Sequence, residues 1–148
     1  MSHLEANAGV EIEAPPARVA AVLADPDAPR RLFGLDVRRG GPVPVRWRGG
    51  SRFSVAMSVH GEEAVFDVRV GRLTRQRLDF VASGPIVIDA TGDLRTAGMG
   101  RTWMELSAAV SGRGFAGELA AAVAAGVLRG GTLGRILAAV KRHAERVP

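Results

Sequence analysis

The sequence predicts an α+β fold in which a curved antiparallel sheet of about six or seven strands wraps around one long carboxy-terminal helix. Two patterns predict it. Between residues 43 and 111, apolar and polar residues alternate with the period of two that is typical of strands. Between residues 115 and 147, apolar residues recur every three or four positions, which places them on one face of a helix. The members of this face are Phe115, Leu119, Val123, Val127, Leu133, Ile136, Leu137, Val140 and Ala144.

The opposite face of the predicted helix is mostly basic, so the helix should rest its apolar face on the sheet. Four glycines interrupt it, and each costs about 1 kcal/mol relative to alanine. They are Gly126, Gly130, Gly131 and Gly134. The adjacent glycines favour a kink or break at residues 129–131, with Thr132 capping a separate last helix. Close approach of the helix to the sheet or to a ligand is the alternative.

The amino-terminal third predicts a strand followed by two short helices. Residues 9–14 alternate as a strand with one polar face, and Pro15 with Pro16 ends it. Residues 17–24 form the first helix, and residues 27–33 form the second, which begins with an aspartate cap and ends at a glycine. Residues 1–8 are expected to be flexible.

Six alternating segments then predict the body of the sheet. They cover residues 43–48, 52–60, 64–70, 77–82, 86–94 and 100–111. The connections are short, so neighbouring strands should be antiparallel. If the apolar side of each strand faces the helix, the inward side chains are Trp47, Phe53, Val55, Met57, Phe66, Val68, Leu78, Phe80, Ile86, Ile88, Met104, Leu106 and Val110.

Composition limits the classes of function. The 148 residues fit one domain, and the absence of cysteine excludes disulfides and thiolate metal sites. The amino terminus lacks the features of a signal peptide, and no apolar run approaches a membrane span, so we expect a cytoplasmic protein. The net charge is +5, but the arginines are scattered without stacking aromatics, so no nucleic acid is expected as a partner. Arginine in place of lysine, with abundant alanine and glycine, is typical of a GC-rich bacterial genome.

The order of these elements resembles the helix-grip fold of the START-like (SRPBCC) superfamily, over nearly the whole chain. The local matches are residues 10–19, Asp25-Pro26, residues 100–106 on the last strand, and residues 137–145. This superfamily includes polyketide cyclases and dehydrases, lipid-transfer domains and pollen-allergen-type ligand binders. The resemblance implies an apolar cavity between the sheet and the long helix. A shorter match at residues 110–115 resembles the branch of the superfamily that is associated with carbon monoxide dehydrogenase.

Candidate catalytic groups are few. The chain has no tyrosine, and its histidines are His3, His60 and His143. His60 with Asp67 or Asp89 could form a proton-transfer pair, but the alternation places all three on the solvent face. Paired carboxylates such as Glu11 with Glu13, or Asp89 with Glu105, are interpreted as solvated. No catalytic residue, metal site, nucleotide site or cofactor is therefore predicted.

The sequence thus predicts the binding of a small hydrophobic molecule, such as a polyketide, acyl chain or lipid, by Trp47, Phe53, Met57, Phe66, Phe80, Ile88, Met104, Leu106, Val123 and Val127. One alternative is an enzyme of the polyketide cyclase or dehydrase kind that shapes its substrate in the same cavity. Another is a protein- or membrane-interaction module that uses the basic face of the helix, of the kind associated with carbon monoxide dehydrogenase. A homodimer is left open.

Overall fold

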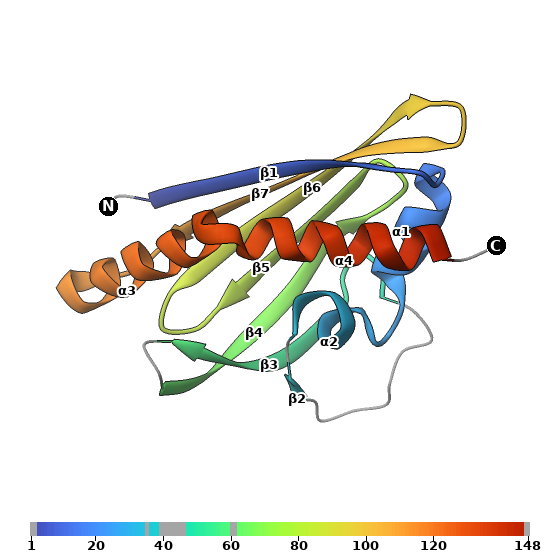
Figure 1. The fold of residues 1–148 in the computed structure, drawn as a ribbon. Coiled ribbons are helices and arrows are strands. Elements are labelled where there is room, and N and C mark those ends of the chain that lie inside the picture. Colours follow the sequence, from blue (N-terminus) through green and yellow to red (C-terminus); the bar gives the residue numbers. More distant parts are fainter. Residues whose placement is uncertain (1–2, 35, 39–46, 60–61, 147–148) are drawn as a thin grey trace.

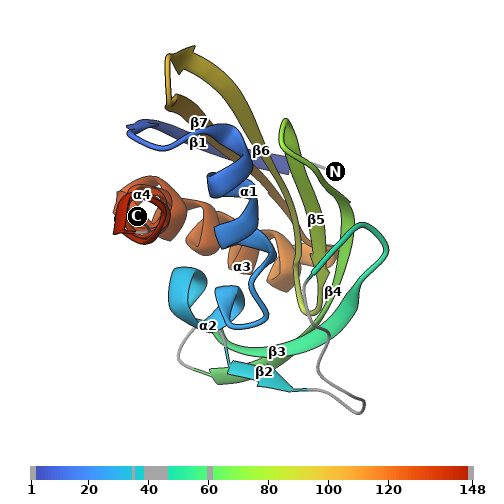
Figure 2. The ribbon, with the colours of Figure 1, turned by 90° about the vertical axis from the view of Figure 1, so that its right-hand side faces the viewer.

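The computed structural model describes residues 3–34, 36–38, 47–59 and 62–146. One antiparallel sheet of seven strands, in the order β1-β7-β6-β5-β4-β3-β2, forms its body. The sheet is strongly curved, and the long carboxy-terminal helical segment lies along its concave side (Figures 1 and 2). The predicted architecture is confirmed. The strands are β1 (His3–Ile12), β2 (Asp36–Arg38), β3 (Arg52–Val59), β4 (Glu62–Leu73), β5 (Arg77–Ser83), β6 (Val87–Gly98) and β7 (Arg101–Ser111).

Two short helices follow β1 and cover one end of the concave side, next to the end of the last helix (Figure 2). Both were predicted within one residue. Helix α1 (Pro16–Ala24) begins with a proline, whose missing N–H has no helical partner in the first turn. Helix α2 (Ala28–Phe33) ends at Gly34, which takes the left-handed conformation with φ 66°. The carboxy-terminal segment comprises α3 (Gly114–Val127), η1 (Leu128–Thr132) and α4 (Leu133–Arg146).

Strand β1 is longer than predicted. It begins at His3 and pairs with β7 along its whole length, from His3 opposite Ser111 to Ile12 opposite Thr102. The expectation that residues 1–8 are flexible is therefore wrong for residues 3–8. The reason is that β7 offers a free edge to this segment, in which Leu4, Ala6 and Ala8 share the inner face with the apolar residues of β7.

The predicted strand at residues 43–48 cannot be compared over residues 43–46, which lie outside the described residues. Trp47 is described and belongs to no strand. Its main-chain N–H donates a hydrogen bond to the carbonyl oxygen of Ala24 at 2.7 Å, which ties this segment to the end of α1. The edge strand that pairs with β3 is β2, which the sequence analysis missed because it is only three residues long.

Helix α4 packs as predicted. Its buried residues are Leu133, Leu137, Ala139, Val140 and Ala144. They join one hydrophobic cluster with the inner side chains of β1 and with α1 and α2. By length and composition alone, the helical segment Gly114–Arg146 could cross a membrane. Within this segment, α4 buries its apolar stripe against the sheet and is the core helix of the fold.

Helix α3 corrects the prediction. Its buried residues are Ala121 and Ala125, whereas Phe115, Leu119, Val123 and Val127 are exposed. The predicted apolar face is therefore turned away from the sheet over this half. A close approach explains the reversal: a Cβ at Gly112, after β7, would overlap the main-chain carbonyl oxygen of Gly117. Only the small-residue side of α3 fits at that distance.

The predicted kink is confirmed at the adjacent glycines. Gly131, within η1, has φ 117° and ψ −6°, which is outside the helical region. A left-handed φ of this size is strained for any residue with a Cβ, whereas glycine adopts it freely. Capping of the last helix by the Thr132 side chain stays a prediction, and its hydroxyl accepts a hydrogen bond from Arg135 at 3.1 Å.

The two glycines at the kink predict opposite effects on stability. Gly131→Ala should destabilise the fold by about 1 kcal/mol or more, because alanine is strained at this φ. Gly130→Ala is the matched control: no other atom crowds a Cβ at either position, and Gly130 has no positive φ. Alanine there should stabilise the helix by up to about 1 kcal/mol. Urea unfolding of both variants measures the difference, and equal effects would contradict the assigned kink.

A polar clip fastens the end of α4 to the end of β1. Lys141 Nζ donates hydrogen bonds to the carbonyl oxygen of Glu11 at 3.1 Å and to Glu145 Oε2 at 2.6 Å. The same carboxylate oxygen accepts the main-chain N–H of Glu13 at 2.8 Å. The bond from Lys141, followed by the bond from Glu13, lowers the pKa of Glu145 from its ordinary value.

This clip predicts a pH-dependent contribution to stability. Because the pKa of Glu145 is lower in the folded chain, its charged form stabilises the fold above the unfolded-state pKa, and this contribution is lost as pH falls through the folded-state pKa. The difference in unfolding midpoint between wild type and Glu145→Gln should be largest near neutral pH and disappear at about pH 2. Thermal unfolding at both pH values measures it. Arg142→Gln, at an exposed site of the same helix, is the control. A pH-independent difference for Glu145→Gln would contradict the clip.

Candidate functional site

The candidate site lies on the concave face of the sheet, where the strand register places the predicted inward side chains. Phe66 pairs with Val55 across β3 and β4, and Leu94 pairs with Met104 across β6 and β7. The described inward residues that are fully or nearly buried are Trp47, Val55, Phe66, Val68, Leu78, Ile86, Met104, Leu106 and Val110. Phe53, Phe80 and Ile88 are partly buried. Met57 pairs with Ala64, and its side chain lies outside the described part.

These side chains form two separate hydrophobic clusters. The first gathers α1, α2 and α4 on the inner faces of β1 and of β4 to β7, and Met104 and Leu137 are among its fully buried members. The second gathers α3 on β3, β4, β5 and β7, and its fully buried residues include Phe66, Val55 and Ile86. The interior is thus divided along the length of the carboxy-terminal helical segment, near the kink.

Three side chains contact both clusters and are themselves only partly buried: Phe53, Phe80 and Leu128. We call them the apolar seam. They come from β3, β5 and the first residue of η1, so the sheet contributes two of them and the kinked helical segment contributes the third. These side chains touch both clusters and still keep accessible surface. An apolar molecule that covers them would bury apolar area without disrupting either cluster.

Aromatic contacts hold the seam from both sides. The Trp47 ring lies 4.5 Å from the Phe53 ring, centroid to centroid, with an interplanar angle of 36°. The Phe33 and Phe80 rings form a T-shaped pair with centroids 5.8 Å apart and an interplanar angle of 81°. Trp47 also donates its indole N–H to the carbonyl oxygen of Pro26 at 3.2 Å, so its polar atom is satisfied. The rings therefore present apolar surface in fixed orientations.

Polar chemistry is scarce in this interior. Among the described residues, Thr102 is the one buried polar residue, and its hydroxyl donates to the carbonyl oxygen of Ala14 at 2.7 Å. The described side chains leave no buried polar atom without a partner. Asp67, on the outer face, accepts a hydrogen bond from Ser54 at 3.2 Å, Asp89 is exposed, and His60 lies outside the described residues. No group of three metal-ligating residues occurs within the described ranges.

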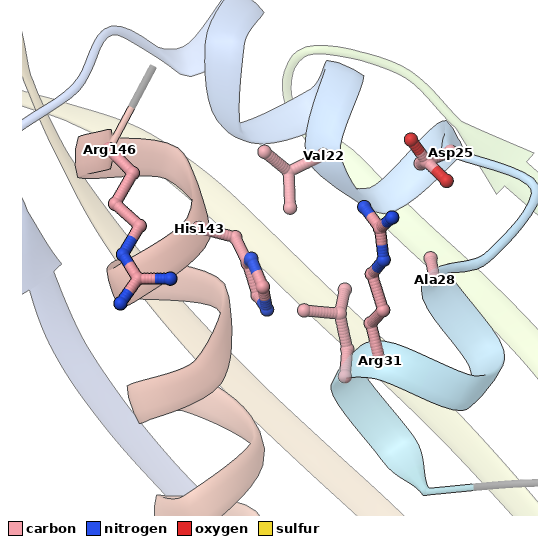
Figure 3. Close-up of a pocket in the computed structure, with 7 residues that line it drawn as sticks. Val22, Asp25, Ala28, Arg31, His143 and Arg146 are labelled. Carbon is pink, nitrogen blue, oxygen red and sulfur yellow. The ribbon is translucent and has the colours of Figure 1, made fainter.

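A cleft with polar and apolar side chains lies between α1, α2 and α4, and none of the three seam residues lines it. Its volume is about 340 Å³, and Figure 3 shows the side chains around it. Val22, Ala28 and Leu32 supply apolar surface, and Asp25, Arg31, His143 and Arg146 supply polar groups. Arg31 is exposed and forms a long ion pair of 3.7 Å with Asp27. None of the ten predicted ligand-binding residues lines this cleft.

The structure separates the predicted site residues into two groups. Phe53 and Phe80 lie in the seam, and Trp47 contacts Phe53 directly. Val123 and Val127 are exposed on α3, so their expected inward orientation is wrong. Phe33 and Leu128 were not among the predicted site residues. A signal for Leu128 was present: Gly117, Ala121, Ala125 and Leu128 recur at helical spacing on the side opposite the large apolar residues.

Comparisons with known proteins agree on the fold. No protein-family model matches the chain, and no curated protein matches its sequence significantly. Several solved structures are similar to the chain in fold. The Zhui aromatase/cyclase from Streptomyces sp. R1128 is similar with a TM-score of 0.76 and 18% identity, covering 98% of this chain and 95% of that one. A START superfamily protein from Mycobacterium smegmatis is similar with a TM-score of 0.68 and 15% identity, covering 99% and 100%.

A third similar structure is norcoclaurine synthase from Thalictrum flavum, solved in complex with dopamine and hydroxybenzaldehyde. Its TM-score is 0.67 at 13% identity, and the match covers 99% of this chain and 89% of that one. At these identities the similarity concerns the fold. The chain therefore has a helix-grip fold, as the sequence predicted, and it shares this fold with the aromatase/cyclase and the START superfamily protein.

Proposed function

We propose that the protein binds a small, mostly apolar molecule at the apolar seam, between the sheet and the kinked helical segment. The observation that carries this proposal is that Phe53, Phe80 and Leu128 remain partly accessible between two closed clusters. Burial of apolar area supplies about 25 cal/mol per Å² before the costs of association are subtracted. A ligand with a planar or chain-like apolar part, such as a polyketide, acyl chain or lipid, fits such a surface best.

The scarcity of buried polar side chains among the described residues favours ligand binding over catalysis. An enzyme of this fold needs at least one polar group that faces its substrate, and the one buried hydroxyl among the described side chains is engaged by the main chain. The cyclase alternative draws support from the similarity to the Zhui aromatase/cyclase. In that case the walls of the seam would hold the substrate in a reactive conformation, with shape supplying most of the effect.

A matched pair of variants on one helical segment tests the location. Leu128→Trp fills the seam, whereas Leu119→Trp adds the same side chain to the exposed face of α3. The neutral fluorescent probe N-phenyl-1-naphthylamine should bind the wild type and Leu119→Trp with similar affinity. Its affinity for Leu128→Trp should fall about tenfold or more, which corresponds to about 1.4 kcal/mol of binding free energy.

The titrations need folded variants, so circular dichroism and thermal unfolding accompany each one. If Leu128→Trp retains the native spectrum and still binds the probe as tightly as Leu119→Trp does, the seam is not the binding site. If the wild type binds no apolar probe at all, the interior is a solid core and the proposed ligand binding is contradicted.

A further inference from the structure

The exposed side of α3 is apolar over its whole length and has no partner among the described residues. Relative exposure is 84% for Phe115, 54% for Leu119, 44% for Val123 and 57% for Val127. The other exposed positions on this side are small, namely Ala116, Ala122, Gly126 and Gly130. We call these eight residues the outer α3 face. A contiguous exposed apolar face of this kind marks a contact surface.

Two charged residues flank the outer α3 face along one edge. Glu118 and Arg129 are eleven residues apart, close to three helical turns, so they lie on the same side of the helix. Glu118 is exposed and has no hydrogen-bond or ion-pair partner among the described residues. Arg129 donates from Nε to the carbonyl oxygen of Glu5 at 2.8 Å, which leaves the other donors of its guanidinium for a further partner.

The positions of these charges match a second copy of the chain. Glu118 precedes Val123 by five residues and Arg129 follows it by six, which places them about 7.5 and 9 Å from Val123 along the axis. Two α3 helices that pack antiparallel about a two-fold axis at Val123 therefore bring Glu118 of each copy to Arg129 of the other. The two-fold axis places both Glu118–Arg129 pairs along the same edge of the helix pair, one at each end, so both pairs form at once.

Side-chain size fits the same arrangement. The axis at Val123 places Leu119 of one copy opposite Val127 of the other, so these two apolar side chains cover each other. It also places Phe115, the bulkiest and most exposed residue of the face, at the other copy's Gly130 and Gly131, where no atom would crowd an added Cβ. Large residues at one end thus meet small residues at the other, as close helix packing requires.

We infer that the outer α3 face is a self-association surface that forms an antiparallel α3–α3 homodimer about Val123. One helix face covers less than the about 800 Å² per partner of a standard interface, so the dimer should be weak and its population should depend on concentration. The surface is separate from the apolar seam, which lies on the opposite side of the same helical segment, so a dimer leaves the seam free.

Analytical ultracentrifugation of the full chain tests the inference at concentrations up to about 500 μM. The wild type should show a reversible monomer–dimer equilibrium. Val123→Glu, which places two like charges at the axis, should lower the association constant about tenfold or more. Val65→Glu is the matched control, because Val65 is a valine of similar exposure on the outer face of β4, and it should leave association unchanged.

Charge reversal tests the register. Glu118→Arg and Arg129→Glu should each weaken association several-fold, and the double variant should recover most of the wild-type constant because the pairs re-form with opposite polarity. Arg129→Ala measures the separate effect of losing the bond to Glu5.

A wild type that stays monomeric would overturn the inference. So would a double variant as weak as the single ones, or equal loss in Val65→Glu and Val123→Glu. A monomer that co-sediments with phosphatidylglycerol vesicles through this face would assign it to a membrane instead.

Discussion

The close approach of α3 to the end of β7 determines the rest of the interior. Gly112 and Gly117 meet so tightly that a Cβ at Gly112 would overlap the carbonyl oxygen of Gly117, and a Cβ at Gly117 would crowd the main chain of Gly112. The helix therefore turns Ala121 and Ala125 inward and its large apolar residues outward. An alanine face fills less volume than a leucine face would. The core below α3 is thus closed mainly by sheet residues such as Phe66, while the region near Leu128 stays partly accessible.

The kink separates two helices that pack on the sheet in different ways. Before Gly131 the helix lies on the sheet by its small residues, and after Gly131 it lies by a leucine and valine stripe. The change of direction allows α4 to reach α1 and α2, where the clip from Lys141 and Glu145 to β1 holds its end. The seam lies where these two modes of packing meet. Its residues are therefore held in place by the strands β3 and β5 and by the helical segment, which pack against other parts of the fold.

The sequence predicted the elements better than it predicted their orientation. Strand alternation assigned the inner face of β3 to β7, because a one-residue error would place charged residues inside. The kink followed from adjacent glycines. The outward turn of Phe115 and Val127 could not be predicted from periodicity, because both sides of α3 are apolar and hydrophobicity alone prefers the larger residues inside. The deciding contact, Gly112 with Gly117, joins residues only five apart in the chain, but it depends on the angle at which α3 leaves β7, which hydrophobic periodicity does not encode. Strand β2 and residues 3–8 were missed since short or weakly apolar segments depend on a neighbouring edge for pairing.

The most direct test of this account is a methyl NMR titration of the wild type with N-phenyl-1-naphthylamine. Leu128 and Ile88 pack against the second cluster, whereas Leu119 and Val123 lie on the outer α3 face, so their methyl signals distinguish the interior from that face. The account predicts saturable shifts for Leu128 and Ile88, with Leu119 and Val123 unchanged. Shifts confined to Leu119 and Val123 would place apolar binding on the outer α3 face and contradict the assignment of the seam.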